Sequence, residues 1–379
     1  MRRLAIAPRP DFQARLEAVG LSFHSWDDYW REDVCYAFSA AQIDHLEAVT
    51  LELHRMCVEA ARFIVARERF ADLGIPEPFW GPIAESLARD DFSLYGRFDL
   101  AYDGQSEPRL LEYNADTPTS LLESAVAQWY WLEDLRAGGQ PHLDQFNSLH
   151  ERLVEQWRRL GRQGVERVHF TSMADNEEDW VCTAYLADTA LQAGLQAPHL
   201  YIGELGWSGA SGDFVDLDNA PVAALFKLYP WEWLMREPFG CHIPGSATRF
   251  IEPLWKSLLA CKGLLPILWE LFPGHPNLLP AFFEADRGRL DSYARKPLYS
   301  REGANVALYE GGRLVGEDGG PYGQEGFIYQ ALHRLPRFGD RYPVIGAWVV
   351  GDEPAGICLR EDVSPITTNM SNFVPHYFE

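Results

Sequence analysis

The segment that decides the fold lies near residue 100 and reads Arg97-Phe98-Asp99, then a turn at Asp103-Gly104, then Leu110-Leu111-Glu112-Tyr113-Asn114. Residues two apart on a strand point to the same face, so Arg97 shares a face with Asp99. Glu112 and Asn114 share a face in the same way. Antiparallel pairing about a turn near residue 105 sets Asp99 opposite Glu112, and the same register sets Arg97 opposite Asn114. We therefore predict a β-hairpin that gathers two carboxylates and an amide oxygen at one point.

Hard oxygen ligands in this number suit magnesium, which proteins usually hold by one or two carboxylates while substrate phosphates fill the other positions. The hairpin thus predicts a divalent-metal site for nucleotide chemistry, with Asp99, Glu112 and Asn114 as ligands. The alternative is a solvated hairpin that carries an ordinary Arg-Asp pair.

The residues after the hairpin favour a helix that starts beside this site. Thr117 suits an N-cap, Pro118 suits the first helical position, and residues 121–135 are rich in apolar side chains. We expect the free N–H groups of this helix to hold a phosphate or a carboxylate. A purely capping role for Thr117 is the alternative.

Composition restricts the class of function. The chain has 379 residues, of which 47% are hydrophobic, so it can bury a large core in two or three packed subdomains. Its net charge of −22 opposes binding to nucleic acid and to anionic membranes, and it is compatible with a cationic substrate such as an amine. With neither a signal peptide nor an apolar run of transmembrane length, a cytoplasmic protein is expected. The six cysteines have no CxxC spacing, which indicates free thiols.

The pattern of apolar residues predicts a mixed α/β fold. Residues 40–69 have helical spacing and follow Ser39, a possible cap. The middle of the chain alternates helices (142–160 and 178–193) with strands (165–171, 199–202 and 222–228). A helix is expected at 262–271. The rest of the chain is β-rich, with strands expected at 294–298, 305–310, 327–332, 344–350 and 355–360. Because no repeat or linker stands out, we expect interleaved subdomains.

A second group of residues suits nucleotide phosphates. Lys262 and Lys296 lie in apolar settings and can act as point charges toward phosphates, although a surface lysine with a buried stem is the alternative for each. The loop at 300–305 can close over phosphates through its backbone N–H groups. Arg360, at a strand end, can neutralise a transferring phosphoryl group, and an ion pair with the acids that follow it is the alternative. The strand at 327–332 resembles a hinge whose backbone bonds an adenine edge.

Together these residues make the chain similar to the synthetase half of the glutathionylspermidine synthase family, and closer to its short members, which are described as acid-amine ligases. The resemblance covers nearly the whole chain and rests on motifs in the family's order: Arg97-Phe98-Asp99, Glu112-Tyr113-Asn114-Ala115-Asp116, Lys262 with Pro266 and Trp269, Lys296-Pro297, Gly303-Ala304-Asn305 and Cys358-Leu359-Arg360. It implies an α/β (α+β) fold of the circularly permuted ATP-grasp type with interleaved subdomains. Residues 1–379 would form one catalytic unit, with the metal-binding hairpin at 95–119, a central α/β region at 140–250 and a nucleotide-binding, β-rich region at 255–379.

The resemblance also implies roles for single residues. Asp99, Glu112 and Asn114 would bind a pair of magnesium ions. ATP would be bound by Lys262, Lys296, Gly303, Gln330 and Arg360. Arg97 and Arg360 would be catalytic, since Arg97 would hold the reacting acyl phosphate or carboxylate and Arg360 would stabilise the transferring γ-phosphate. The substrates would be bound by Arg97, Thr117, Glu177, Glu178 and Arg301.

The implied reaction is an ATP-dependent ligation of a carboxylate and an amine through an acyl phosphate. The acid would be a small molecule or a peptide, and polyamines are candidates for the amine. No amidase-like segment precedes the hairpin region, so a cycle of synthesis and hydrolysis is not expected. The loop at 300–305 and the Thr-Pro-Thr after Asp116 depart from the family pattern, which weakens the case for glutathione and spermidine as the substrates.

Two other functions compete with this one. A catalytically silent ATP-binding module, acting as a sensor or partner protein, would keep the same fold without an acceptor. A metal-dependent hydrolase would use Asp99 and Glu112 as an acid-base pair and would leave Lys262 and Lys296 without a role.

Overall fold

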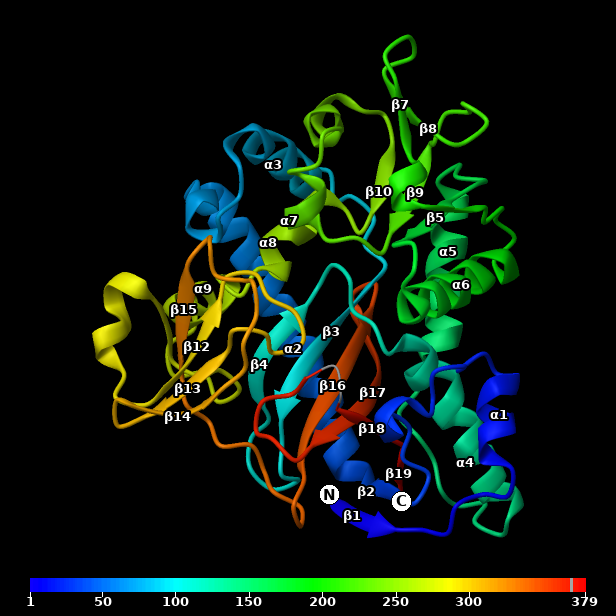
Figure 1. Cartoon of the computed structure of the whole chain (residues 1–379), viewed down its shortest axis with the longest axis vertical. Coiled ribbons are helices and arrows are strands. Elements are labelled where there is room, and N and C mark those ends of the chain that lie inside the picture. Colours follow the sequence, from blue (N-terminus) through cyan, green and yellow to red (C-terminus); the bar gives the residue numbers. More distant parts are fainter. Residues whose placement is uncertain (369–370) are drawn as a thin grey trace.

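A five-stranded antiparallel sheet forms the centre of the molecule (Figure 1). In the computed structural model, which describes residues 1–368 and 371–379, its strand order is β18-β17-β16-β3-β4. The strands are β3 (Tyr95–Ala101), β4 (Arg109–Asn114), β16 (Tyr342–Val350), β17 (Glu353–Asp362) and β18 (Asn372–Val374). Strands from the far end of the chain thus extend the hairpin near residue 100 into a sheet. Among them, β16 pairs directly with β3.

A long helix covers this sheet. Helix α2 (Ala40–Ala66) packs against β16 and β17, and its buried residues recur at helical spacing. Ser39 caps it, because the Ser39 side chain accepts from the Gln42 N–H while the Gln42 side chain accepts from the Ser39 N–H. The helix predicted for this segment is confirmed, and it ends three residues earlier than predicted.

A parallel sheet lies to one side of the centre, in the order β10-β9-β5-β6. Its strands are β5 (His169–Ser172), β6 (His199–Tyr201), β9 (Ala224–Lys227) and β10 (Arg249–Ile251), and helices α5 (Leu149–Arg162) and α6 (Glu177–Gln192) accompany it. A small hairpin, β7 (Gly206–Ser208) and β8 (Asp213–Val215), projects beyond it in Figure 1. Helix α5 begins seven residues later than predicted, because Asp144 pairs with Phe378 and the Ser148 N–H bonds to the Ala355 carbonyl.

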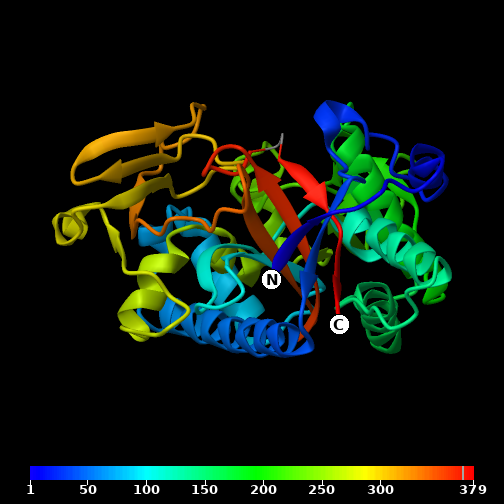
Figure 2. The same ribbon diagram turned by 90° about the horizontal axis from the view of Figure 1, so that it is seen from below.

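An antiparallel sheet flanks the centre on the opposite side, as Figure 2 shows. Its order is β11-β15-β12-β13-β14, with β11 (Ala281–Phe283), β12 (Tyr293–Pro297), β13 (Ala307–Glu310), β14 (Arg313–Glu317) and β15 (Phe327–Ala331). Helices α8 (Ser257–Ala260) and α9 (Leu264–Leu271) connect it to the rest of the chain. The region at 255–379 therefore contributes strands to this sheet, to the central sheet and, through its last residues, to a sheet with the start of the chain.

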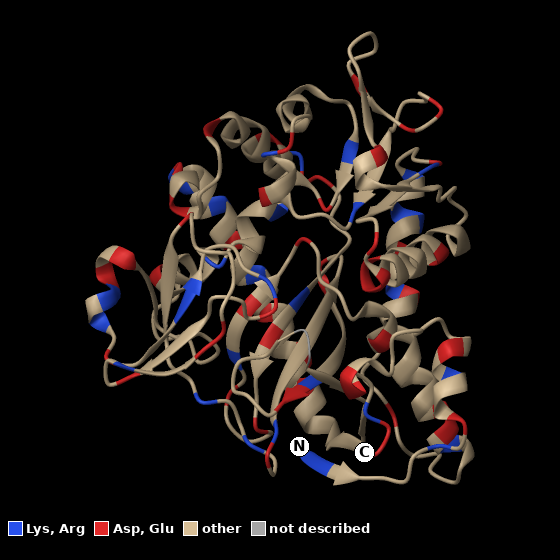
Figure 3. Ribbon diagram, viewed as in Figure 1, with Lys and Arg blue, Asp and Glu red and all other residues tan. Residues whose placement is uncertain are grey.

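The two ends of the chain meet in a further small sheet of β1 (Arg2–Ala5), β2 (Val34–Phe38) and β19 (His376–Phe378) (Figures 1 and 2). The remaining helices are α1 (Phe12–Ala18), α3 (Trp80–Ala88), α4 (Gln128–Ala137) and α7 (Trp231–Leu234). Within the described residues, no helix has both the length and the apolar character needed to cross a membrane. Acidic residues are spread over every part of the fold (Figure 3), so the negative net charge is not gathered in one region.

The helix predicted to begin at Thr117 begins at Leu121 instead. The Arg97 side chain donates to the Thr119 carbonyl oxygen at 2.7 Å, and the Tyr95 hydroxyl donates to the Pro118 carbonyl oxygen at 3.3 Å. Ser120 then adopts a left-handed backbone with φ of 67°. Because side chains of β3 occupy carbonyl groups that a helical turn would need, residues 117–120 are irregular, and Thr117 is not an N-cap.

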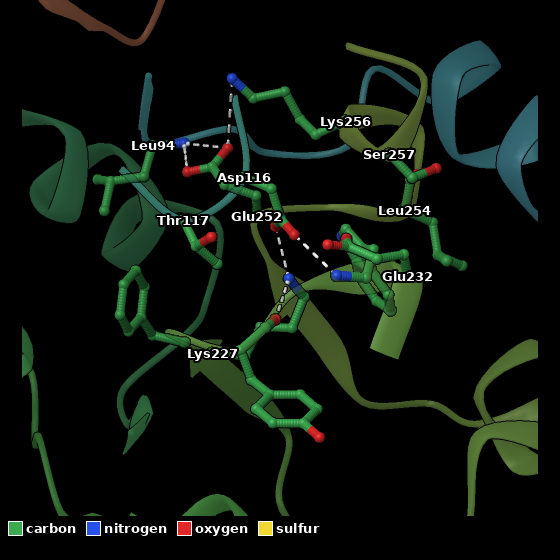
Figure 4. A network of polar contacts seen from close by, with 12 residues as sticks. Leu94, Asp116, Thr117, Lys227, Glu232, Glu252, Leu254, Lys256 and Ser257 are labelled. Carbon is green, nitrogen blue, oxygen red and sulfur yellow. Dashed lines mark hydrogen bonds and ion pairs between the residues drawn. The ribbon is translucent and has the colours of Figure 1, made fainter. Parts of the chain in front are cut away.

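A buried ionic network joins the hairpin to the parallel sheet (Figure 4). Lys227, at the end of β9, is fully buried and its Nζ lies 2.5 Å from Oδ1 of Asp116, which follows β4. The second oxygen of Asp116 accepts from the Trp231 N–H at 2.9 Å. Glu252, also fully buried, accepts from the backbone N–H groups of residues 94 and 95, where β3 starts. These contacts hold the hairpin at both ends against the carboxyl edge of the parallel sheet.

Candidate active site

The register of the hairpin is the predicted one. Arg97 pairs with Asn114 and Asp99 pairs with Glu112, with a bulge only after Asp99. Arg97 and Asp99 are each 4% exposed, so the Arg-Asp pair is buried and the alternative of a solvated pair is wrong. Four polar side chains therefore line one face of the hairpin.

Asp99 lies between two arginines. Its Oδ1 accepts from Arg97 Nε at 2.8 Å, and its Oδ2 accepts from Arg360 Nη2 at 2.7 Å. Arg360 comes from β17, and β16 lies between that strand and β3. Arg360 thus pairs with Asp99 rather than with the acids that follow it in the chain, and one of these, Glu361, binds Arg3 at 2.6 Å.

Gly346 of β16 lies between the strands that carry these side chains, since it is paired with Asp99 on one side and with Cys358 on the other. A Cβ atom at Gly346 would lie 2.8 Å from Arg97 Cδ and 2.6 Å from Cys358 Sγ, closer than real Cβ contacts. A glycine at this position therefore makes room for Arg97 to reach Asp99.

Gly346→Ala is expected to lower turnover by about a hundredfold, because the added methyl displaces Arg97 from its contact with Asp99. The change is measured as the rate of ATP-dependent product formation, together with the melting temperature. The matched control is Gly81→Ala in α3, where an added Cβ meets nothing within 4 Å, and this variant should keep full activity. Equal activity of the two variants would contradict the role given to Gly346.

Two lysines approach the other end of the hairpin. Lys262 Nζ lies 3.1 Å from Glu112 Oε2 and donates to the Ser300 carbonyl oxygen at 2.9 Å. Burial would raise the pKa of Glu112, but the charges of both lysines outweigh it and hold this pKa well below its usual value. Lys296 donates to the Leu111 carbonyl oxygen and to Gln330 Oε1 at 2.9 and 2.8 Å, and burial lowers its pKa to about 8. Neither lysine is an ordinary surface residue.

Two cavities meet at the hairpin. The first has a volume of about 520 Å³ and combines both lysines and Gln330 with apolar walls that include Leu279, Leu308 and Val344. The second has a volume of about 430 Å³ and is lined by the arginines of the site and by aromatic side chains. Asp99, Glu112, Gly303 and Thr367 line both cavities, so the candidate metal ligands stand at their junction.

The second cavity lies at the carboxyl edge of the parallel sheet. Residues that follow β5 (Met173, Asn176, Glu178 and Asp179) and β9 (Leu228, Pro230 and Trp233) line it. Ligands of open α/β sheets bind at this edge.

The acidic wall of the second cavity is formed by Glu178, Asp179 and Glu302. Burial raises the pKa of Asp179 to about 6 and also raises that of Glu302, and the neighbouring carboxylate of Glu178 adds to both effects. Glu177, predicted to share this role, is exposed and accepts from the Ser22 hydroxyl at 2.5 Å. It is not part of the cavity lining.

Arg301 is held in place by residues from other segments. Its Nη1 donates to Thr117 Oγ1 at 3.0 Å, its Nη2 lies 3.4 Å from Glu232 Oε1, and its guanidinium lies over the ring of Trp233 at 5.1 Å. Two residues further on, Gly303 has φ of +73°, and a Cβ there would lie 2.5 Å from the Thr367 carbonyl oxygen. The loop at 300–305 is thereby packed between the hairpin and residues 366–367.

Most of the predicted site residues converge in this region. The two cavities are lined by Arg97, Asp99, Glu112, Asn114, Thr117, Glu178, Lys262, Lys296, Arg301, Gly303, Gln330 and Arg360. Sequence reasoning missed Glu232, Trp233 and the Lys227–Asp116 pair, because no local spacing links residues so far apart in the chain. Asp179 could have been predicted, because it directly follows Glu178 in the chain.

The donor set of the hairpin fits magnesium. Two carboxylates and one amide are hard oxygen donors, too few to fill an octahedral shell, so phosphate oxygens would complete it. No group of three or more His, Cys, Asp or Glu side chains suited to a metal exists among the described residues. A zinc-type site of nitrogen and sulfur ligands is therefore not built by this part of the chain.

The fold and the two adjoining cavities define the class of this protein, the ATP-grasp enzymes. Residues 3–379 match the family model described as glutathionylspermidine synthase preATP-grasp, and the chain belongs to this family. Membership makes it an ATP-dependent ligase that forms C–N bonds, and the predicted fold and enzyme class are confirmed.

Relatives of known name agree with this placement. The chain is 42% identical over 395 residues to the "Putative acid–amine ligase" of Haemophilus influenzae, with all of both chains covered. It is 30% identical to trypanothione synthetase of Crithidia fasciculata, over 85% of this chain and 53% of that one. It is 28% identical to the bifunctional glutathionylspermidine synthetase/amidase of Escherichia coli, over 90% of this chain and 58% of the relative. The chain thus spans a little over half the length of the last two.

A solved structure shows the same fold. The glutathione synthetase-like effector of Globodera pallida, in its apo form, superposes with a TM-score of 0.58 at 11% identity and covers 98% of each chain.

Proposed function

We propose that this chain joins a carboxylate to a primary amine, using ATP to activate the carboxylate as an acyl phosphate. The observation that carries the proposal is the junction of the two cavities at Asp99 and Glu112, with lysines on one side and arginines and carboxylates on the other. A nucleotide in the first cavity would direct its terminal phosphate toward a substrate in the second.

The first cavity fits ATP. Lys262 and Lys296 would bind the phosphates as point charges, and Gly303 would let the backbone of its loop approach them. The apolar walls and the strand that carries Gln330 would hold the adenine. Magnesium, held by Asp99, Glu112 and Asn114, would supply neutralisation of the phosphate charge.

The second cavity fits two substrates of opposite charge. Arg97, Arg301 and Arg360 would hold the acid, and the Nε atoms of the last two have no hydrogen-bond partner among the described residues. The acidic wall, with Glu178, would attract the amine. Thr117 would contact the acid next to Arg301. Holding both substrates in one cavity brings the amine nitrogen to the activated carbonyl, while Arg97 and Arg360 offset the charge that develops during phosphoryl transfer.

The direct test is magnesium-dependent ADP release, measured with and without short peptides, amino acids and polyamines. Stimulation by one acid–amine pair, together with an amide product that contains both, supports the proposal and names the substrates. ATP binding with no ADP release under any acceptor would favour a silent nucleotide-binding module. Turnover without ATP would favour a hydrolase.

The affinity for nucleotide is expected to fall as the pH rises through about 8. Burial lowers the pKa of Lys296 to about 8, the charge of Glu112 opposes this shift, and the charge of Lys262 adds to it. Lys296 is therefore a cation below this pH and becomes neutral above it. The loss should approach tenfold per pH unit above the pKa until phosphate binding itself keeps the lysine charged.

Calorimetric titration of a non-hydrolysable ATP analogue between about pH 7 and pH 9.5 measures this dependence. Lys296→Arg is the control, because an arginine stays charged over the whole range and should abolish the dependence. An identical pH profile for the two proteins would show that Lys296 does not bind the phosphates.

A further inference from the structure

We propose that the arginines and lysines of the site block the metal ligands in the free protein, so that a divalent metal ion binds only together with the nucleotide. This inference rests on the proposed function and concerns the order of binding at the same site. The observation behind it is that both carboxylates of the hairpin are already paired with the cations that would bind phosphate.

Asp99 is fully engaged. Arg97 takes one of its oxygens at 2.8 Å and Arg360 takes the other at 2.7 Å, and Asp99 is 4% exposed. Charge-assisted contacts of this length in a buried site are strong, so an incoming metal ion would have to displace an arginine from each oxygen it binds.

Glu112 is engaged in the same manner. Lys262 lies 3.1 Å from its Oε2, and Asn114 donates to its Oε1 at 3.4 Å. That last contact also turns the amide nitrogen of Asn114, rather than its oxygen, toward Glu112. Both carboxylate ligands are therefore paired with cations, and the Asn114 amide nitrogen faces Glu112.

The local charge points in the same direction. At the junction of the two cavities, four cations (Arg97, Lys262, Lys296 and Arg360) face the two carboxylates of the hairpin, and this local positive excess disfavours a divalent ion at Asp99 and Glu112. The three carboxylates of the acidic wall belong to the second cavity, and among the described residues none of them forms a hydrogen bond with Asp99 or Glu112. A triphosphate reverses the sign of this excess. As its oxygens recruit Arg360 and Lys262, they release Asp99 and Glu112 to the metal, and each buried charge keeps a partner throughout the exchange.

Manganese serves as a spectroscopic probe for this order of binding. The free Mn²⁺ signal in electron paramagnetic resonance is titrated with the full-length protein, with and without a non-hydrolysable ATP analogue. We expect the wild-type protein to bind Mn²⁺ at least about tenfold more weakly without the analogue than with it.

Two variants test the cause. Arg360→Gln frees one oxygen of Asp99, while Arg97 keeps the other, and Lys262→Gln removes the cation paired with Glu112. Each variant should therefore bind Mn²⁺ about tenfold more tightly than wild type in the absence of nucleotide. Arg360→Lys keeps the positive charge and should stay near wild type. Adding Asp99→Asn to Arg360→Gln should remove the gained affinity, which places the bound ion at Asp99.

Arg89→Gln is the control for the loss of a positive charge far from the site, since Arg89 pairs with Asp91 at the surface, and it should leave Mn²⁺ binding unchanged. Melting curves of all variants establish that each is folded at the titration temperature.

The outcomes separate this inference from the proposed function. If the wild-type protein binds the ATP analogue but binds Mn²⁺ equally well without it, or if neither glutamine variant gains affinity, the inference is wrong and the proposed function stands. If the analogue does not bind in the presence of magnesium, the proposed function itself fails.

Discussion

Asp99→Asn lowers ATP-dependent turnover by about a thousandfold or more, in our expectation, because the substitution removes the negative charge at the junction of the two cavities. The Asp99 side chain contacts both Arg97 and Arg360. An uncharged asparagine attracts a metal ion less strongly than the aspartate does, and it cannot orient two arginines at once. The measurement is the rate of ADP release at saturating ATP, magnesium and substrates.

The control for Asp99→Asn is Asp340→Asn. The Asp340 side chain is 76% exposed, and its contact with Arg341 is long, at 3.8 Å. It should keep the wild-type rate. Asp99→Asn also leaves two buried arginines with a weaker partner, so its melting temperature is expected to fall. A rate within tenfold of wild type would refute the role of Asp99.

Asn114→Ala separates the loss of a ligand from the loss of stability. The side chain of Asn114 makes one long contact, to Glu112 at 3.4 Å, so its removal should change the free energy of unfolding by no more than about 0.5 kcal/mol. Turnover should nevertheless fall by about a hundredfold if the amide binds a metal ion. Unchanged turnover in a stable variant would exclude Asn114 from the site.

Lys227→Met is expected to lower the free energy of unfolding by about 3–5 kcal/mol, the largest loss of stability that we predict. Lys227 is fully buried, and its partner Asp116 is 3% exposed. The variant leaves Asp116 as a buried carboxylate whose remaining contact is the Trp231 N–H. Urea unfolding followed by tryptophan fluorescence measures the change.

The double variant Asp116→Asn with Lys227→Met is the control, since it removes both charges and leaves an amide to accept from Trp231. It should recover most of the lost stability, as expected for two residues that act as a pair. A loss below about 1 kcal/mol for Lys227→Met alone would show that the pair contributes little.

The same pair has a consequence for the site. Asp116 directly precedes Thr117, and the backbone group that it binds, Trp231 N–H, directly precedes Glu232. Thr117 and Glu232 both contact the guanidinium of Arg301. The buried ion pair therefore helps to position Arg301, an arginine of the second cavity that it does not touch.

Local chemistry decided the features that the sequence alone predicted correctly. The register of the hairpin follows from the two-residue period of a strand and from a short turn, and the cap at Ser39 follows from contacts within three residues. In each case the interacting groups are close in the chain, so their pattern of residue types is enough to specify the structure.

Tertiary structure decided the rest. The residues that follow Thr117 are typical of a helix start. Arg97 and Tyr95 from the neighbouring strand, however, bind the carbonyl groups that the helix would need. Arg360 has two acids beside it in the chain, yet it binds Asp99, which the strand order of the central sheet brings closer to its guanidinium. Both outcomes depend on buried polar groups finding partners across the sheet, because an unpaired buried carbonyl or charge costs more than any local preference provides. The sequence by itself determined the hairpin and most of the candidate site residues, and the packing of distant segments determined which of these residues meet.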